Sequence, residues 1–191
     1  MILSVRRTLV LSCWVACVAA PLAAFGAGAA TAPEARQFDF LLGQWQVSGQ
    51  VKVSGLMAMI HGQPRLAGSW KGWRSADGQG IEDELTLTNA SGTPLSAVHF
   101  TRRFSREENC WKITGRDADK GALPAATARQ QGDEMLMTSS GATPEGKRYR
   151  NRTHYLAITP AGFRMVQDRS YDDGKTWDTG AVTLDVRRTA P

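Results

Sequence analysis

A row of cations on one segment is the feature of this chain best suited to chemistry. In residues 148–158 arginines alternate with polar and aromatic residues, and alternate side chains of a strand lie on the same face. Guanidinium groups donate paired hydrogen bonds to carboxylate or phosphate, so arginines buried without acidic neighbours favour an anionic ligand. We predict that this strand and the next bind such a ligand. The predicted ligand-binding residues are Arg150, Arg152, His154, Gln167 and Arg169.

The direction in which this strand faces decides whether the prediction holds. A four-residue hairpin loop at 159–162 would pair the two strands in a single register. The expected pairs are Ile158 with Phe163, Leu156 with Met165, His154 with Gln167 and Arg152 with Arg169. The apolar pairs would then point into the interior, and the polar pairs would continue the same face. In the alternative, the cations form a solvated outer face and Tyr149, Tyr155 and Val166 line the core.

Other patterns of catalysis and metal binding are weak or missing in the sequence. His154 leaves open a second interpretation as an axial ligand of haem. His61 and His99 have no acidic or cysteine neighbours at the spacing of a zinc site. There is no Gly-x-Ser-x-Gly elbow, no His-Glu-x-x-His helix and no phosphate-binding glycine loop. We therefore predict no catalytic residue, no metal site and no cofactor.

The elements that would position these side chains are short strands separated by turn residues. Apolar and polar residues alternate from 47 to 53, and this period of two recurs along most of the chain. Further strands are expected at 65–74, 81–88, 95–104, 110–116, 134–139, 148–158, 162–170 and 177–187. Eight to ten strands joined by short loops, without a long helical pattern, predict an all-β fold, either a barrel or a sandwich. An antiparallel up-and-down barrel is favoured because closure removes exposed sheet edges.

The N-terminal residues have the features of an export signal. Two arginines precede an apolar stretch at 9–24, and small residues follow at 27–29. The stretch is too short and too interrupted for a transmembrane helix. The residues after the arginines match a twin-arginine signal poorly, and Trp14 is a poor fit to a lipidation site at Cys17. We predict a signal peptide at 1–29, a flexible lead-in at 30–37, a single domain at 38–191 and a periplasmic or secreted protein.

Charge and cysteine content narrow the function further. Loss of residues 1–29 removes two basic residues and lowers the net charge from +5 to +3. The remaining lysines and arginines form no block, which argues against nucleic-acid binding. Cys110 would be the one cysteine left, so no internal disulfide is expected even in an oxidising compartment. Stability must then come from packing and sheet closure.

Residues 38–45, Phe-Asp-Phe-Leu-Leu-Gly-Gln-Trp, join a short apolar helical turn to the first strand. This Gly43-x-Trp45 opening resembles that of the calycin superfamily, which includes lipocalins and fatty-acid-binding proteins. The resemblance implies a ligand-holding barrel in which Trp45 closes one end and stacks on an arginine of the last strand, Arg187 or Arg188. The Thr-Asp-Tyr signature of many lipocalins is missing, which places the chain outside the lipocalins proper.

The stretch from 37 to 188 also resembles a family of exported bacterial calycin-like proteins for which no activity is established. The matching features are residues 38–45, Ile158-Thr159-Pro160 before Phe163, and residues 170–177. This resemblance implies the barrel fold and carries no catalytic residue over to the chain.

Residues 170–177, Ser-Tyr-Asp-Asp-Gly-Lys-Thr-Trp, match the Asp-box pattern Ser-x-Asp-x-Gly-x-Thr-Trp in full. Sialidases carry several such boxes in a six-bladed propeller, and this chain has one copy and is too short for six blades. In the pattern, Asp172 accepts backbone N–H bonds across the turn, Gly174 is left-handed and Trp177 packs under the loop. The motif therefore predicts a hairpin between the last two strands.

The sequence as a whole predicts an exported β-barrel protein that binds a small amphipathic or anionic organic molecule. Apolar side chains would bury the body of the ligand, and Arg152, Arg169 and His154 would orient its acidic group. Two alternatives stay open: an enzyme that uses the same cavity, and a structural or interaction module of the envelope whose interior is packed solid. Neither a nucleic-acid partner nor a membrane span is predicted, and the oligomeric state is left open.

Overall fold

The structure is a computed structural model that describes residues 33–53 and 62–189. The predicted signal peptide at 1–29 lies outside the described residues. Two 3₁₀ helices open the described chain, η1 (Pro33–Arg36) and η2 (Asp39–Leu41). The strands that follow are β1 (Gly43–Val51), β2 (Arg65–Arg74), β3 (Gly80–Asn89), β4 (Pro94–Ser105), β5 (Cys110–Asp117), β6 (Gly121–Ala122), β7 (Ala126–Gln131), β8 (Glu134–Ala142), β9 (Arg148–Thr159), β10 (Gly162–Ser170) and β11 (Asp178–Arg188).

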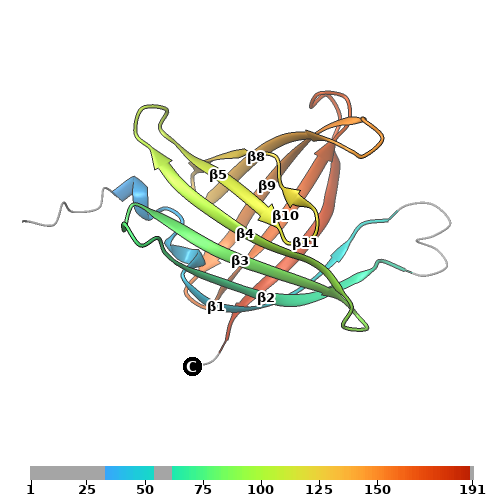
Figure 1. Ribbon diagram of the computed structural model, residues 1–191, viewed down its shortest axis with the longest axis horizontal. Coiled ribbons are helices and arrows are strands. Elements are labelled where there is room, and N and C mark those ends of the chain that lie inside the picture. The colour runs from blue at the N-terminus through green and yellow to red at the C-terminus, as the bar shows by residue number, and fades with distance from the viewer. Residues whose placement is uncertain (1–32, 54–61, 190–191) are drawn as a thin grey trace, which may run out of the picture. The chain divides into compact units, whose positions relative to one another are not determined.

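The strands form a closed antiparallel barrel (Figure 1). Within the described residues, eleven strands pair in the order β4-β3-β2-β1-β11-β10-β9-β8-β7-β5-β6, and a further pairing of β4 with β5 closes the sheet on itself. Between β5 and β8 the wall is made of two pieces, because β6 pairs with the end of β5 and β7 with its beginning. The predicted all-β up-and-down barrel is confirmed, and the sandwich alternative is wrong.

The predicted strands agree with the observed ones except at the two-residue β6 and at β7, which the sequence pattern did not reveal. The inward-facing residues of β7, Ala126 and Ala128, are buried against the core. Alanine contrasts weakly with polar neighbours, so residues 126–131 lack the alternation that marks the other strands. The predicted helical turn is present as η2, and part of the predicted lead-in forms η1.

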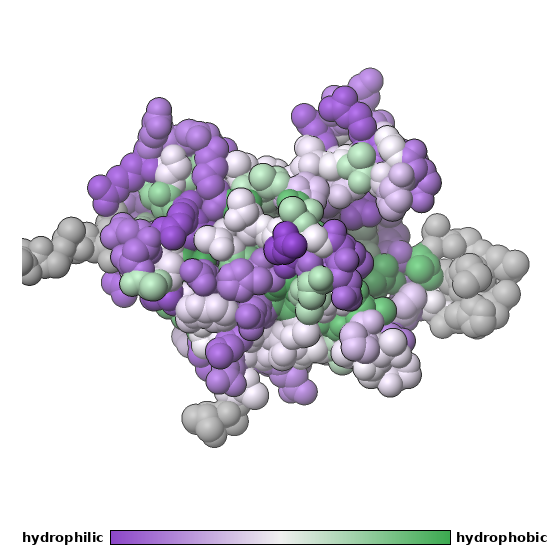
Figure 2. All heavy atoms as spheres, in the orientation of Figure 1, coloured by the Kyte–Doolittle hydropathy of each residue, from purple (hydrophilic) through white to green (hydrophobic). Residues whose placement is uncertain are grey.

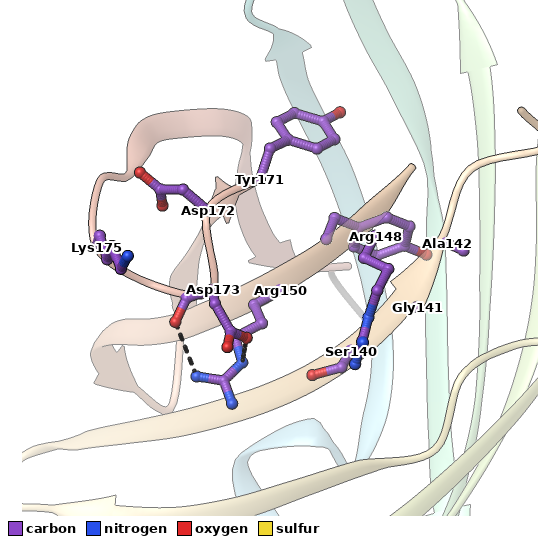
Figure 3. A pocket seen from close by; sticks show the side chains of 10 residues that line it. Ser140, Gly141, Ala142, Arg148, Arg150, Tyr171, Asp172, Asp173 and Lys175 are labelled. Carbon is purple, nitrogen blue, oxygen red and sulfur yellow. Dashed lines mark hydrogen bonds and ion pairs between the residues drawn. The ribbon is translucent and has the colours of Figure 1, made fainter. Parts of the chain in front are cut away.

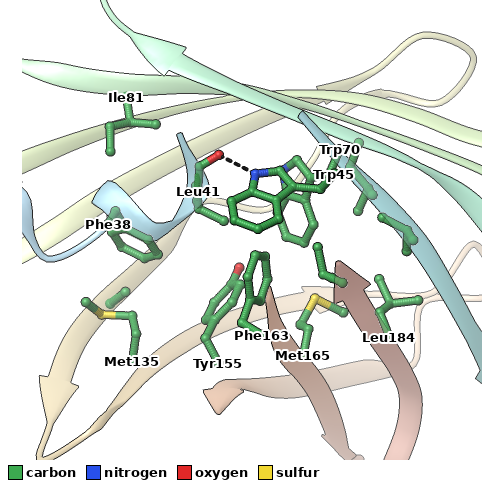
Figure 4. Close-up of a cluster of buried hydrophobic side chains, with 14 of the residues drawn as sticks. Phe38, Leu41, Trp45, Trp70, Ile81, Met135, Tyr155, Phe163, Met165 and Leu184 are labelled. Carbon is green, nitrogen blue, oxygen red and sulfur yellow. Dashed lines mark hydrogen bonds between the residues drawn. The ribbon is translucent and has the colours of Figure 1, made fainter. Parts of the chain in front are cut away.

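The core lies at the end of the barrel where β1 begins, which we call the closed end. Trp45, Trp70, Tyr155 and Phe163 meet there, with ring centroids 5.5–6.3 Å apart (Figure 4). Leu41 of η2 covers this cluster, and its carbonyl accepts a hydrogen bond of 2.8 Å from Trp45 Nε1. The apolar side of η2 therefore seals one end of the barrel against water.

Trp45 and Arg188 connect the first strand with the last. The guanidinium carbon of Arg188 lies 4.1 Å from the centre of the Trp45 ring, so the cation–π contact that the resemblance implied is made by Arg188 and not by Arg187. Gly43 has a φ of +116°, and a side chain at this position would collide with Arg188. Trp45 is thus part of the barrel floor.

The loop between β10 and β11 folds as the predicted Asp-box hairpin. The Asp172 carboxylate accepts hydrogen bonds from the hydroxyl of Thr176 at 2.6 Å and from its backbone N–H at 2.9 Å. These bonds, the hydroxyl contact first, lower the pKa of Asp172 to about 2. Gly174 has a φ of +92°, and the ring of Trp177 lies against it. Hydrophilic residues gather at this hairpin, at the upper right of Figure 2, and at the β4–β5 hairpin, at the upper left.

Candidate ligand site inside the barrel

The pairing of β9 with β10 differs by one residue from the predicted register. Thr159 pairs with Gly162, but the next pair is Leu156 with Arg164, so one extra residue stands on β9. Ala157 occupies this bulge with a φ of +49°. The predicted pairs Ile158–Phe163, Leu156–Met165, His154–Gln167 and Arg152–Arg169 are therefore wrong. The observed pairs are Tyr155–Met165, His154–Val166, Thr153–Gln167, Arg152–Asp168 and Asn151–Arg169.

A one-residue shift moves side chains to the opposite face of a sheet. Tyr155 and Met165 belong to the buried core, so their face of the two strands is the inner one. Alternation places Thr153, Asn151, Gln167 and Arg169 on that inner face. Arg150, Arg152 and His154 leave from the outer face. The five predicted residues thus do not form one cluster. The alternative of an outward cation row describes β9 correctly, but it placed Val166 in the core, and Val166 pairs with His154 on the outer face.

Arg152 and His154 have acidic neighbours on the outer face. Arg152 Nε donates to Asp168 Oδ2 at 2.7 Å, and its guanidinium group lies 4.4 Å from the centre of the Trp177 ring. His154 Nδ1 lies 3.3 Å from Glu134 Oε2, and its Nε2 lies 3.8 Å from Asp168. Because His154 points away from the lumen, it does not face a haem held inside the barrel.

Arg150 also has an acidic neighbour. Its Nε lies 3.1 Å from Asp173 Oδ1, and its Nη1 donates to the Asp173 carbonyl at 3.0 Å. The contact ties β9 to the Asp-box hairpin. Asp168 was not expected as a partner because the predicted register paired Arg152 with Arg169, and Asp173 was not expected because it lies in the hairpin loop, outside the paired strands.

Gln167 and Arg169 belong to a polar patch on the inner face. Gln167 Nε2 donates to Thr153 Oγ1 at 3.3 Å, and Arg169 Nε donates to Asn151 Oδ1 at 2.9 Å. The Arg169 guanidinium group also lies 4.6 Å from the centre of the Tyr149 ring. Among the described residues, no carboxylate forms an ion pair with Arg169. We call these five residues the inner polar patch.

Apolar side chains line the rest of the inner face toward the open end, away from η2. They pack on the core yet stay partly exposed, unlike the fully buried residues at the closed end. The set comprises Val51, Leu87, Phe100, Met137 and Val182. These side chains are therefore partly accessible to solvent, and the inner polar patch lies on the same inner face of the sheet. Such a lining suits an amphipathic molecule.

A buried ion pair lies between this lumen and the closed end. Arg102 and Asp83 are both fully buried, and Arg102 Nε and Nη2 donate to the two carboxylate oxygens at 2.5 and 3.1 Å. Trp70 Nε1 donates to the same carboxylate at 2.8 Å. Burial alone would lower the pKa of Arg102, but the charge of Asp83 raises it above its ordinary value. Burial also raises the pKa of the Tyr155 hydroxyl beside this pair.

Sequence reasoning overlooked this pair although a signal was present. Asp83 alternates in phase with Ile81 and Leu85, so it belongs to the apolar face of its strand. Arg102 alternates in phase with Val98 and Phe100 in the same way. A single acid and a single base on two buried faces indicate an internal ion pair.

No family model matches this chain, and no curated protein matches its sequence. The closed antiparallel barrel supports the calycin-like fold that the Gly43-x-Trp45 opening implies. The helices of the described residues are single short turns, and neither could span a bilayer. Within 33–53 and 62–189, His, Cys, Asp and Glu side chains form no group suited to a metal ion. The candidate site is therefore defined by the geometry of the barrel.

Proposed function

We propose that the protein is an exported carrier that binds a small amphipathic organic acid inside its barrel, in the periplasm or outside the cell. The observation that carries the proposal is Arg169, an inward-facing cation without a carboxylate partner among the described residues, on the same inner face as a set of partly exposed apolar side chains. The fold is consistent with ligand binding, because barrels of this size hold one small molecule.

Two contributions would hold such a ligand. Burial of its apolar body against Phe100, Met137 and Val182 contributes about 25 cal/mol per Å² of surface removed from water. The Arg169 guanidinium group would donate charge-assisted hydrogen bonds to the acidic group, each worth about 1.5–3 kcal/mol. Gln167 offers an amide next to it. The ligand head would then lie at the open end and its tail toward the core.

A fluorescent fatty acid and the alcohol of equal chain length test the proposal. In the Arg169→Ala variant we expect the acid to bind at least about 10-fold more weakly, which corresponds to about 1.4 kcal/mol. The alcohol should bind with unchanged affinity. Arg164→Ala is the matched control, because Arg164 lies on the outer face of the same strand and faces Asp185. Equal affinity of the acid for the wild type and the Arg169 variant would contradict the assignment.

Export is tested separately. The full chain is produced in a Gram-negative host, and the mass of the product in the periplasmic fraction and the medium is measured. We expect a product that begins near residue 30. A full-length product retained in the cytoplasm would contradict export without affecting the ligand site.

A further inference from the structure

A groove lies beside the Asp-box hairpin, between this hairpin and the neighbouring ends of β8 and β9. Its floor is formed by β8 and β9, and its wall is the hairpin between β10 and β11 (Figure 3). The hollow has a volume of about 750 Å³. Ser140, Arg148, Arg150 and Lys175 are among the residues that line it. We call it the hairpin groove.

The hairpin groove continues into a second hollow. This second hollow has a volume of about 480 Å³ and shares Ser140 and Arg150 with the first. Thr127, Thr138 and Trp177 line it. The two hollows are therefore neighbours along β8 and β9.

Two of the cations in the groove form no ion pair with the described residues. Asp172 is held by Ser170 and Thr176, and Asp173 by Arg150. Arg148 and Lys175 are exposed, and neither forms an ion pair or a side-chain hydrogen bond with any described residue. An anionic group in the groove would therefore meet two free cations, while the nearby carboxylates are already paired.

The remaining surface of the groove is rich in hydroxyl groups. Thr127 and Thr138 place their Oγ1 atoms 3.3 Å apart, and Ser140 lies on the same face of β8 as Thr138. A hydroxyl both donates and accepts, so such a row matches a ligand that itself carries many hydroxyls. Trp177 adds an aromatic surface with a polar N–H at its edge. Hydroxyls, an indole and free cations together match an acidic sugar.

The wall of the groove is fixed before any ligand arrives. The Asp-box hydrogen bonds hold the turn, and Arg150 clamps the Asp173 carbonyl from β9. A rigid wall lowers the conformational entropy lost on binding. The geometry points to a binding site for an acidic oligosaccharide in the hairpin groove, with Arg148 and Lys175 contacting its acidic groups. Tyr149 and Asn151 of the inner polar patch also border the two hollows, but the two cations of this site differ from Arg169, the cation of the lumen site.

Calorimetric titration with three probes tests the site: a galacturonate oligosaccharide, a heparin-derived oligosaccharide and a neutral cello-oligosaccharide. The first carries carboxylate groups and the second carries both sulfate and carboxylate groups, and we expect saturable binding of one or both and none of the neutral probe. The Arg148→Ala/Lys175→Ala double variant should bind the acidic probe at least about 10-fold more weakly. Arg65→Ala/Arg116→Ala is the matched control, since both residues are exposed cations on other strands.

The indole N–H resonance of Trp177 locates the bound sugar. It should shift on titration in the wild type and stay fixed in the double variant. The inference is overturned if no probe binds saturably, if the neutral probe binds as well as the acidic ones, or if both double variants lose the same affinity. Equal loss of affinity in the two double variants would show that the acidic probe is attracted by the positive charge of the protein as a whole and not by the groove. Arg169→Ala should leave sugar binding unchanged, so failure here and failure of the lumen site are told apart.

Discussion

At the scale of single residues, Arg102 is the side chain whose substitution we expect to lower the stability of the protein most. Its charge is removed from water, and the rings of Phe38 and Phe100 lie 4.8 and 5.2 Å from its guanidinium carbon. Asp83 compensates the charge, but Nη1 has no hydrogen-bond partner among the described residues. A buried pair of this kind contributes little net stability, yet removal of one partner leaves the other charge stranded.

We therefore expect Arg102→Met to lower the free energy of unfolding by about 3–5 kcal/mol. Arg103→Ala is the matched control, because Arg103 is the next residue on β4, lies on the outer face and pairs with the exposed Asp77. That change should cost about 1 kcal/mol or less. Urea unfolding followed by tryptophan fluorescence measures both. If the two variants lose similar stability, the Asp83 charge is better solvated than its burial indicates.

A second variant separates the stranded charge from lost packing. Arg102→Met combined with Asp83→Asn removes both charges and leaves Trp70 an amide oxygen to donate to. The double variant should recover part of the stability lost by the single one. No recovery would mean that the guanidinium group acts by filling space.

At the scale of elements, the bulge on β9 decides what the strand presents to the lumen. Ala157 adopts a left-handed conformation that costs a residue with a Cβ about 1–2 kcal/mol. The extra residue turns Arg150, Arg152 and His154 outward and brings Asp168 across from Arg152. Periodicity predicted the strand and its turn correctly, but nothing in an alanine signals a bulge. The register, and with it the predicted site, therefore could not be read from the sequence.

We expect Ala157→Gly to stabilise the protein by about 0.5 kcal/mol. Relief of the left-handed strain exceeds the entropy that glycine adds to the unfolded chain. The same substitution at Ala97, an exposed position within β4, should instead destabilise by about 0.5–1 kcal/mol. Thermal unfolding of the two variants shows whether each substitution stabilises or destabilises the protein. Destabilisation by both would show that position 157 is not strained.

The Asp-box hairpin is the element that the sequence predicted most completely, because its pattern names each hydrogen-bonding group in order. It also gives a pH dependence. The folded-state pKa of Asp172 is about 2, whereas an unfolded aspartate has a pKa of about 4. Between these values the unfolded chain binds more protons, so the stabilisation by Asp172 is complete above pH 4 and is lost as the pH falls toward 2.

Unfolding free energies measured from pH 5 to pH 2 test this. The slope of the unfolding free energy against pH, between pH 4 and pH 2, should become shallower in Asp172→Asn, because asparagine has no carboxylate to take up a proton. Thr176→Val removes the largest cause of the lowered pKa, so its slope should lie between those of wild type and Asp172→Asn. Tyr171→Phe, next in the chain and exposed, should behave as wild type. Identical slopes in all variants would show that Asp172 is not linked to folding.

At the scale of the molecule, closure of the barrel depends on the pairing of β1 with β11, the two ends of the sheet in sequence. The resemblance of the Gly43-x-Trp45 opening to that of the calycin superfamily implied this closure and a stacking arginine at the end of the last strand. The sequence predicted the lining of the lumen less well, because the residues that face inward depend on the register of every strand pair around the barrel. The predicted register of β9 with β10 was wrong by one residue. A row of cations was therefore expected in the lumen, where the structure has the inner polar patch.

Arg188 is the residue that joins these ends. Besides its contact with Trp45, it donates from Nε to the Pro160 carbonyl at 2.8 Å and from Nη2 to the Leu42 carbonyl at 3.3 Å. It thereby holds the last strand to the chain after η2 and to the β9–β10 turn. We expect Arg188→Ala to lower the free energy of unfolding by about 1–2 kcal/mol, from the lost cation–π contact and hydrogen bonds.

Arg187→Ala is the matched control for closure. Arg187 is the preceding residue, faces outward between Gln46 and Gly162, and should contribute about 0.5 kcal/mol or less. Amide hydrogen exchange adds a readout of position. In Arg188→Ala the amides of Trp45 and Val186 should exchange faster, because the seam between the first and last strands opens first. Faster exchange spread evenly over the barrel, or equal loss of stability in the two variants, would show that the seam is held by its backbone pairing and that Arg188 merely lies over it.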